Sequence, residues 1–217
     1  MHTPQFCGLF LYNESECCIL VIGFDGDNPN KYMVQQEEYI PRAVEHVRSS
    51  VLLQHIMYVQ SNCLVLSEIK FTVFSDQLFD SSINQCLLVE RMRFRLPQHS
   101  SIISLEFDDN QARILLVYSF YVEDQLKYTM LEIDFNGKML RKRLVERVDC
   151  AKYIYYQDYT PYVLVAMGNK VQLLGEHFNV VREAETHGKI KQIEQLGNVA
   201  VLIDEQRVEY DLQIWSE

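Results

Sequence analysis

The side chains that could do chemistry are scattered along the sequence instead of being gathered into motifs. The six histidines form no H-x-H or H-E-x-x-H pattern, and the six cysteines form no C-x-x-C pair. Zinc sites depend on such spacings because they bring several imidazole or thiolate groups onto one ion. Phosphate-cradling glycine loops and the G-x-S-x-G nucleophile motif are also missing. The sequence therefore predicts no catalytic residue, no metal site and no bound cofactor.

Three arginines have the spacing of a binding surface. Arg91, Arg93 and Arg95 alternate with apolar residues. Successive side chains of a β-strand point to opposite faces, so an extended strand here would carry three guanidinium groups on one face. This face is a candidate for binding an acidic segment of a protein partner. Ordinary solvation of a charged strand is the alternative.

A second basic group consists of Arg141, Lys142 and Arg143. It lies in a charged segment, 139–146, that we predict to be the outermost strand of a sheet. Basic side chains there are candidates for binding the same kind of acidic partner. The alternative is that their charge protects an exposed sheet edge against aggregation.

Tyrosines gather between residues 153 and 162. Tyrosine supplies rigid contact area with a polar tip and is enriched at interfaces. Tyr155, Tyr156 and Tyr159 are therefore candidates for contact with a partner. Packing between neighbouring sheets is an equally good explanation of this cluster.

The charge balance argues against nucleic acid as a partner. The sequence has 30 acidic and 20 basic residues, which gives a net charge of -10. An acidic protein repels a polyphosphate backbone and gains nothing from releasing its counterions. The expected partners are other protein subunits, and the local basic groups would recognise their acidic peptide segments.

The sequence gives no sign of a membrane span or of secretion. No apolar run approaches the roughly 18 residues of a membrane-spanning helix. The first residues have no basic segment followed by a long apolar run. Without a secretory leader, the cysteines are expected to be reduced thiols. We therefore expect an intracellular protein, located in the cytoplasm or the nucleus.

β-strands are the elements that must position these residues. Hydrophobic residues make up 48% of the sequence, which includes 13 tyrosines and 11 phenylalanines, and such side chains favour strands. Runs bounded by turn residues predict strands, for example at 17–23, 112–120 and 126–134. The Asn136-Gly137 pair predicts a type I′ hairpin turn, because both residues accept the positive φ that this turn requires.

One segment is ambiguous between helix and strand. A helix beginning at Pro41 and reaching residue 57 would place Val44, Val47 and Val51 on one face. The alternative makes 50–59 the first strand of the second structural unit. We favour the strand.

A nearly continuous apolar strand recurs along the chain, and a strand that is apolar on both faces is buried on both faces. Its central residues are Leu20, Val65, Leu116, Leu164 and Ala200. They are separated by 36 to 51 residues, with a mean interval of 45. In the last three units an apolar strand precedes this strand, an alternating strand follows it, and a charged segment ends the unit.

This pattern resembles that of a highly diverged β-propeller of the WD40-like kind, whose blades have four strands in about 40 to 50 residues. The Gly-His and Trp-Asp signatures of WD40 repeats are missing, and the single tryptophan, Trp215, is followed by serine. The resemblance implies an all-β fold, a β-propeller or partial propeller of about five four-stranded units, in a single domain over 1–217. A β-sandwich or barrel is the alternative, since it also has many short strands.

About five units leave two architectures open. The propeller could close alone, by pairing a strand at 5–12 with one at 212–216. It could also be an open partial propeller that a partner or a further segment completes, because unprotected sheet edges must be covered.

The spacing of the units and the lack of catalytic motifs predict a non-catalytic module for protein–protein interaction, a scaffold subunit of a larger complex. The chain is not expected to be an enzyme. The alternative is an enzyme or small-ligand-binding propeller whose site is assembled from dispersed residues.

Overall fold

The computed structural model describes most of the backbone of the chain. The described residues are 5–12, 17–25, 28–40, 44–50, 54–72, 85–155, 161–196 and 199–213, with side chains at 44–50, 54–70, 88–155, 161–196 and 199–210. Two compact units, Met1–Arg95 and Leu96–Glu217, make up the chain. The prediction of one domain over 1–217 stays a prediction.

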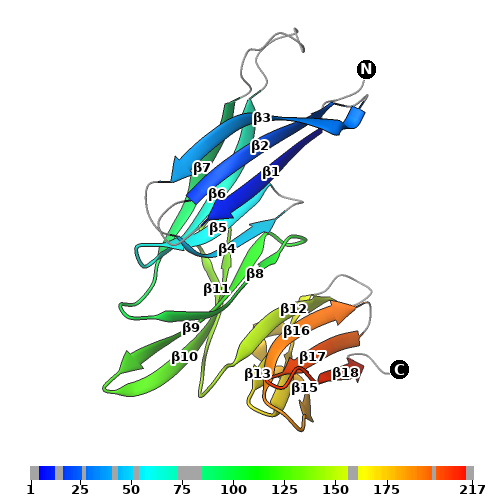
Figure 1. Ribbon diagram of the computed structural model, residues 1–217. Helices are drawn as coiled ribbons and strands as arrows, with labels where there is room; N and C mark the ends of the chain where they lie inside the picture. Colours follow the sequence, from blue (N-terminus) through cyan, green and yellow to red (C-terminus); the bar gives the residue numbers. More distant parts are fainter. Residues whose placement is uncertain are drawn as a thin grey trace. The chain divides into compact units, whose positions relative to one another are not determined.

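The first unit contains two antiparallel sheets whose strands follow chain order (Figure 1). Sheet 1 consists of β1 (Gln5–Tyr12), β2 (Cys17–Asp25) and β3 (Asn28–Ile40). Sheet 2 consists of β4 (Glu45–Ser50), β5 (His55–Gln60), β6 (Cys63–Thr72) and β7 (Gln85–Arg95). Each strand pairs with the next one, so each sheet is a meander.

The second unit contains three sheets of the same kind. Sheet 3 consists of β8 (Ser101–Asp108), β9 (Arg113–Val122), β10 (Gln125–Asp134) and β11 (Met139–Val145). Sheet 4 consists of β12 (Cys150–Tyr155), β13 (Pro161–Met167), β14 (Lys170–Leu174) and β15 (Val180–Glu185), with a 3₁₀ helix, η1 (Glu176–Phe178), before β15. Sheet 5 consists of β16 (Ile190–Leu196), β17 (Val199–Asp204) and β18 (Glu209–Gln213).

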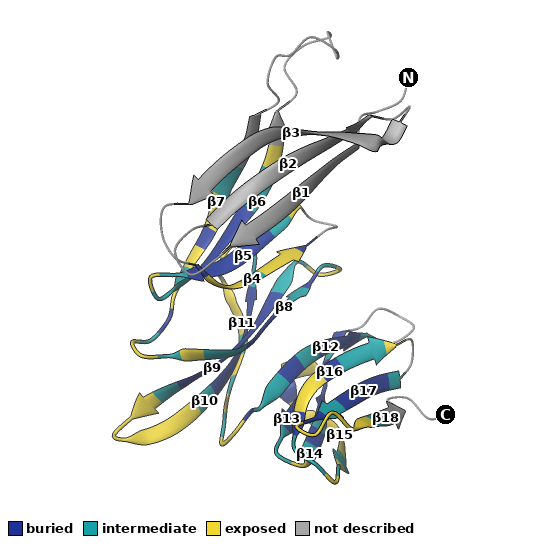
Figure 2. Cartoon of the chain, in the orientation of Figure 1, coloured by how far each residue is buried: buried dark blue, intermediate teal, exposed yellow. Residues whose placement is uncertain are grey.

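The core of the second unit lies between its sheets, and β13 contributes to it on both faces. Buried residues are marked on the strands in Figure 2. Val163 and Val165 pack into a cluster with residues of sheet 3, whereas Leu164 and Ala166 pack into a cluster with residues of sheet 5. This follows from the period of two along a strand. The prediction that the recurring apolar strand is buried on both faces is confirmed for β13.

The first strands of sheets 3, 4 and 5 are neighbours, since β12 lies beside both β8 and β16. The Ser104 hydroxyl on β8 accepts the backbone N–H of Ala151 on β12 at 2.9 Å. The last strands of sheets 3 and 4, β11 and β15, carry mainly exposed or half-buried side chains, as predicted for outer strands. In sheets 3 and 4 the first strands are more buried than the last strands, which is the grading of a propeller blade.

Sheet 2 differs from the prediction in one respect. Residues 41–57 do not form one helix, because β4 and β5 both come from the region 45–60. The strand that we favoured at 50–59 exists as β5, but β5 is the second strand of the sheet and β4 is the first. Val65 therefore lies in the third strand, whereas Leu116, Leu164 and Ala200 lie in second strands. Our pattern missed this because β5 and β6 are both buried runs.

The turn between β10 and β11 is not of type I′. Gly137 has a φ of 82°, and Asn136 has no positive φ. The N–H of Gly137 donates to the carbonyl of Asp134 at 3.0 Å, and the Asp134 carboxylate accepts the N–H groups of Asn136 and Lys138 at 2.9 Å each. This is a type I turn followed by one left-handed residue, which the aspartate side chain stabilises.

The turn between β17 and β18 repeats this arrangement with arginine in place of glycine. Arg207 has a φ of 64°, and its N–H donates to the carbonyl of Asp204 at 3.1 Å. The Asp204 carboxylate accepts the N–H groups of Gln206 and Val208 at 2.8 and 2.9 Å.

No helix in the described part of the chain is long and apolar enough to span a membrane.

Replacing Arg207 by glycine should stabilise the protein. The exposed arginine holds a left-handed backbone that a Cβ disfavours. We expect Arg207→Gly to raise the free energy of unfolding by roughly 0.5 to 1 kcal/mol, because relief of strain exceeds the extra freedom of glycine in the unfolded chain. Urea denaturation measures this, and the reciprocal variant Gly137→Arg should be destabilised. A destabilised Arg207→Gly would contradict the equivalence of the two turns.

Candidate functional site

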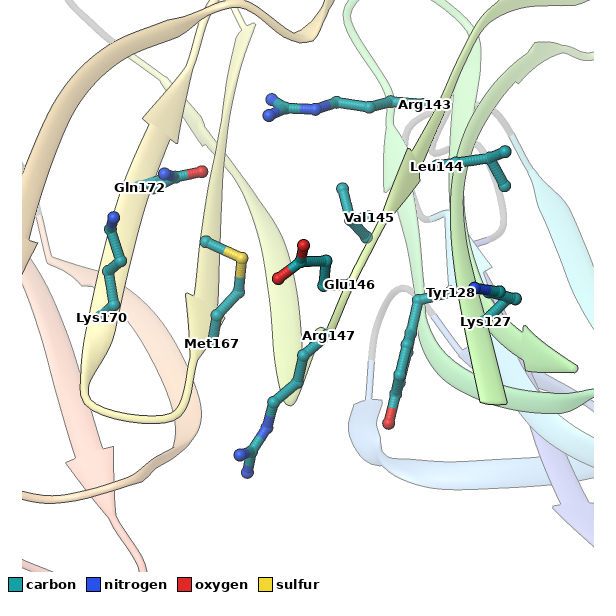
Figure 3. A pocket seen from close by; sticks show the side chains of 10 residues that line it. All are labelled: Lys127, Tyr128, Arg143, Leu144, Val145, Glu146, Arg147, Met167, Lys170 and Gln172. Carbon is teal, nitrogen blue, oxygen red and sulfur yellow. The ribbon is translucent and has the colours of Figure 1, made fainter. Parts of the chain in front are cut away.

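A groove lies between sheets 3 and 4 of the second unit (Figure 3). Its cavity volume is about 740 Å³. The residues that line it are Lys127, Tyr128, Arg143, Leu144, Val145, Glu146, Arg147, Met167, Lys170 and Gln172. Its walls therefore come from β10, β11 and the residues after β11 on one side, and from β13 and β14 on the other.

The floor of the groove is apolar. Tyr128, Val145 and Met167 are partly buried and pack against the core cluster between sheets 3 and 4. That cluster contains the fully buried residues Met130 and Val165. The groove is thus the open end of this core, and it offers apolar surface that a bound segment would cover.

Basic side chains dominate the rim of the groove. Lys127, Arg143, Arg147 and Lys170 are present, whereas Glu146 supplies the single carboxylate among the described residues that line it. Figure 3 shows the Arg143 side chain extending from β11 toward sheet 4. A local positive charge on an acidic protein favours an anionic ligand.

Two of the four basic residues have carboxylate partners outside the groove. Arg147 pairs with Asp149 at 3.0 Å, and Lys170 pairs with Glu183 at 2.7 Å. The other two, on β10 and β11, form no ion pair with a described residue. They carry the charge that is available to a ligand.

A buried carboxylate fixes the sheet 3 wall of this groove. Glu132 on β10 is 1% exposed, and the Arg141 guanidinium on β11 lies 2.7 Å from its Oε2 and donates to its Oε1 at 2.9 Å. Tyr153 on β12 donates its hydroxyl to Oε1 at 2.7 Å, and Arg113 on β9 lies 3.4 Å from Oε2. These partners hold the charge in place, because a buried carboxylate without partners is very unfavourable.

Burial, followed by the charge of Glu132, raises the pKa of the Tyr153 hydroxyl well above its ordinary value. The hydroxyl therefore stays protonated at neutral pH and remains a donor to the carboxylate. Since Tyr153 belongs to sheet 4, this hydrogen bond joins the two sheets that form the groove.

Arginines of β11 bind the outer part of sheet 4. Arg141 donates from Nη1 to the carbonyl of Gly175 at 2.8 Å, and its guanidinium lies 4.3 Å from the centre of the Phe178 ring. Arg143 donates from Nη1 to the carbonyl of Phe178 at 2.6 Å. The two arginines share one face of β11 because they are two residues apart. Together they set the separation of β11 from the segment around η1.

The Asp149 carboxylate holds together three segments of the chain: the residues after β11, the turn between β13 and β14, and the residues before β16. It accepts the backbone N–H of Gly168, and it lies 3.0 Å from Arg147 and 3.1 Å from Lys189. Burial by itself would raise the pKa of Asp149, but Arg147, the Gly168 amide and Lys189 outweigh burial and hold this pKa below its ordinary value of 3.8.

Of the three tyrosines that we predicted to contact a partner, the structure describes Tyr155. Its hydroxyl donates to Oδ1 of the fully buried Asp108 at 3.2 Å, which links β12 to the end of β8. Burial raises the pKa of Asp108, and the hydrogen bonds from the backbone amides of Gln111 and Asn110 offset part of this increase. Tyr155 therefore packs between sheets, which was our alternative for this residue. Tyr156 and Tyr159 lie outside the described residues.

The arginines of β7 alternate as predicted, since Arg91, Arg93 and Arg95 are exposed. Two of them are already paired within sheet 2: Arg91 with Glu68, and Arg93 with Glu90. Arg95 forms no ion pair with a described residue. Their predicted role in partner binding stays a prediction.

The predicted cluster on β11 divides between its two faces. Arg143 faces the groove, whereas Lys142 is exposed on the opposite face. The Arg141 side chain is only 11% exposed and is held by Glu132, so it supports the groove and is not available as a contact. The spacing of the basic residues could not reveal this role of Arg141. Spacing predicts which residues share a face of the strand, but it does not predict that a buried carboxylate lies on the neighbouring strand.

Sequence reasoning missed several residues of the site. Lys127 and Lys170 lie far apart in the sequence, and no local pattern connects them. Glu132 had a signal that we did not use: it is a lone carboxylate inside the apolar run Met130–Leu131–Glu132–Ile133. A charge in a buried strand requires a partner, and Arg141 lies on the next strand.

The described residues show no metal centre, since no group of three or more His, Cys, Asp or Glu side chains among them could hold an ion. Burial raises the pKa of the Cys150 thiol to about 12, so this thiol is protonated at neutral pH.

No protein-family model and no curated protein matches the sequence. Among solved structures, the chain is similar to Sqt1 of Saccharomyces cerevisiae, with a TM-score of 0.52, 8% identity and coverage of 95% of this chain and 68% of that one. It is also similar to the WD40 domain of Neurospora crassa Pan2, with a TM-score of 0.45, 12% identity and coverage of 93% and 59%. These neighbours are WD40 propeller domains.

The chain is a β-propeller or part of one. A protein of unknown function from Bacteroides caccae is a further neighbour, with a TM-score of 0.47, 11% identity and coverage of 89% of this chain and 69% of that one. The identities are low, so the likeness concerns the fold alone. The prediction of a diverged propeller is confirmed.

The buried pair of Glu132 and Arg141 should dominate the stability of the blades that flank the groove. We expect Arg141→Met to lower the free energy of unfolding by about 3 to 5 kcal/mol, because it leaves a buried carboxylate without its main partner. The double variant Glu132→Leu/Arg141→Met should be destabilised by clearly less than the sum of the single variants. Urea denaturation of the four proteins gives this coupling. Additive losses would contradict it.

Arg113→Met is the matched control for this pair, since Arg113 is 34% exposed and more distant from Glu132. We expect it to cost about 1 kcal/mol or less.

The contribution of Asp149 to stability should depend on pH. Because the folded-state pKa of Asp149 lies below 3.8, its charge stabilises the propeller above that pH, and this contribution is lost as the pH falls through the folded-state pKa. We expect Asp149→Asn to cost about 1 to 2 kcal/mol at pH 7 and progressively less below about pH 4. Thermal unfolding across this pH range tests it, with Asp124→Asn as an exposed control. A loss that is independent of pH would exclude the ion pairs as its cause.

Proposed function

We propose that this chain is a non-catalytic interaction module that serves as a subunit of a larger complex inside the cell, in the cytoplasm or the nucleus. Its contact surface consists of β11 and the adjacent groove, which we name the β11 surface. The main support is that an outer strand at the end of a sheet exposes large apolar side chains.

The outer strand β11 exposes three large apolar side chains. Met139 is 49% exposed, Leu140 is 41% exposed and Leu144 is 65% exposed. On sheet 4, Val181 is 52% exposed and lies next to Gly175, the residue whose carbonyl binds Arg141. Exposed apolar groups with a polar rim are typical of protein interaction sites.

The rim of the groove supports an acidic segment as the bound part of the partner. Lys127 and Arg143 have no described ion-pair partner, so an incoming carboxylate would not have to displace one. The net charge of -10 acts against polyanions that contact a wide surface, such as nucleic acid. A short acidic segment of a protein would meet only the local positive charge.

A small anionic ligand is the second candidate, because the cavity volume of about 740 Å³ falls within the range of about 300 to 1,000 Å³ that is common for ligand pockets. It would use the basic rim and the apolar floor without requiring Leu140, which does not line the groove. The two candidates therefore differ in their dependence on Leu140.

Affinity purification of the tagged chain from its native cells, followed by mass spectrometry, tests the interaction module. We expect stoichiometric protein partners, and we expect Leu140→Glu to reduce their recovery by about tenfold, the equivalent of roughly 1.4 kcal/mol, because it places a charge in an apolar contact. Leu126→Glu is the matched control, since Leu126 and Leu140 are both 41% exposed.

Equal recovery with Leu140→Glu and with Leu126→Glu would exclude the β11 surface. If the unmodified chain and both variants are all recovered as lone monomers, this result would contradict the interaction module and favour the small ligand.

A further inference from the structure

We propose that the partner's acidic segment binds as an added β-strand along the free edge of β11, with its acidic side chains directed into the groove. This inference rests on the proposed function, because it specifies how the partner binds at the β11 surface.

The edge of β11 is available for pairing. β11 is the last strand of sheet 3 and pairs with β10 on one side. No backbone hydrogen bond beyond that pairing joins residues 139–145 to another described residue. An edge strand presents unpaired N–H and C=O groups on its free side, and an extended peptide can bind them by continuing the sheet.

The two faces of β11 define what the added strand must carry. Arg143 and Val145 lie on the groove side of β11 (Figure 3), whereas Leu140 and Leu144 are exposed. Side chains of an added strand alternate between the same two faces as those of its neighbour. A segment in which acidic and apolar residues alternate would therefore place carboxylates in the groove and apolar groups beside the two leucines, which flank Lys142 on that face.

The carboxylates of such a segment would meet the Arg143 guanidinium, whose position is already fixed. Arg143 is held in position by its hydrogen bond to the carbonyl of Phe178, which uses Nη1 and leaves the rest of the guanidinium for a ligand. Arg147 follows the end of β11 and is paired with Asp149. Lys127 alternates with Tyr128, whose side chain packs into the core between sheets 3 and 4, so Lys127 lies on the other face of sheet 3. Arg143 is therefore the positive group that a carboxylate on the groove side would meet.

A second copy of this chain is a poorer occupant of the same edge. Antiparallel pairing of two β11 strands about Lys142 would place Lys142 opposite Lys142, with Arg141 and Arg143 opposite each other. Like charges directly opposite in a sheet are destabilising. The basic residues of β11 thus oppose self-association and favour an acidic strand, which is a means of specificity.

The test uses a fluorescein-labelled decapeptide of alternating valine and glutamate, (Val-Glu)5, and fluorescence anisotropy with the complete chain. We expect saturable binding that weakens as salt rises, because charge attraction contributes to it. The peptide (Val-Lys)5 and a peptide of the same composition without alternation should bind at least about tenfold more weakly, since they lose the charge match or the matched faces.

A backbone-modified peptide separates strand addition from simple charge attraction. N-methylation of alternate amides removes hydrogen-bond donors on one edge of the peptide and preserves every side chain. Of the two such peptides, the one methylated on the edge that pairs with β11 should bind at least about tenfold more weakly, whereas the other should retain affinity. Equal affinity of both for the protein would overturn strand addition.

Variants of the protein locate the site. We expect Arg143→Gln to weaken binding of (Val-Glu)5 by about fivefold. Lys191→Gln, an exposed lysine on β16, is the matched control and should have no effect. Unchanged binding by Arg143→Gln would overturn the site. Equally tight binding of the oligonucleotide dT10 would also overturn it, because it would indicate attraction for any polyanion.

The two proposals can fail separately. If Leu140→Glu loses the cellular partner but (Val-Glu)5 does not bind the unmodified chain, the added acidic strand is wrong and the interaction module stands. If Leu140→Glu retains the partner, the β11 surface itself is wrong.

Discussion

Glu132 places a negative charge inside sheet 3, and the surrounding structure is arranged around the need to neutralise it. A carboxylate that is 1% exposed requires partners, and Arg141 and Tyr153 supply them from the next strand and from the next sheet. Arg141 has further donors, and it uses one of them on the carbonyl of Gly175. Arg141 therefore connects the ion pair within sheet 3 to sheet 4. Van der Waals packing alone would leave their relative position less well defined, since apolar contacts are not directional.

The groove is a consequence of this link. The apolar core fills the space between sheets 3 and 4 and ends at Tyr128, Val145 and Met167. Beyond these residues the two walls are held apart at fixed positions by Arg141 and Arg143, and the rim is basic. A surface of this kind has little freedom to lose when a ligand binds, which favours affinity. The same basic residues protect an edge strand from association with other copies, so protection and recognition are compatible here.

Much of the fold could be predicted from the sequence, because a strand that is buried on both faces has apolar residues at consecutive positions. Val163 to Ala166 illustrate this, since alternate residues pack into different clusters. The order of strands in sheet 2 could not be predicted, because β5 and β6 are both apolar and either fits the recurring position. The turn at Gly137 depended on the side chain of Asp134, which a two-residue motif does not include.

The candidate site was less predictable than the fold. The basic run on β11 was recognisable, but its division into a supporting Arg141 and an accessible Arg143 depends on Glu132 of the neighbouring strand. Lys127 and Lys170 come from different sheets, and only the packing of those sheets brings them to one groove. Local spacing predicts faces of strands, whereas a site between sheets requires the tertiary structure.

Hydrogen exchange of the backbone amides, with and without bound (Val-Glu)5, tests the central claim most directly. An added strand would cover the free edge of β11, so the amides of residues 139–145 that point away from β10 should exchange at least about tenfold more slowly in the complex. Amides of β7, the outer strand of sheet 2, should be unchanged. Protection on β7 or β15 with none on β11 would contradict the account.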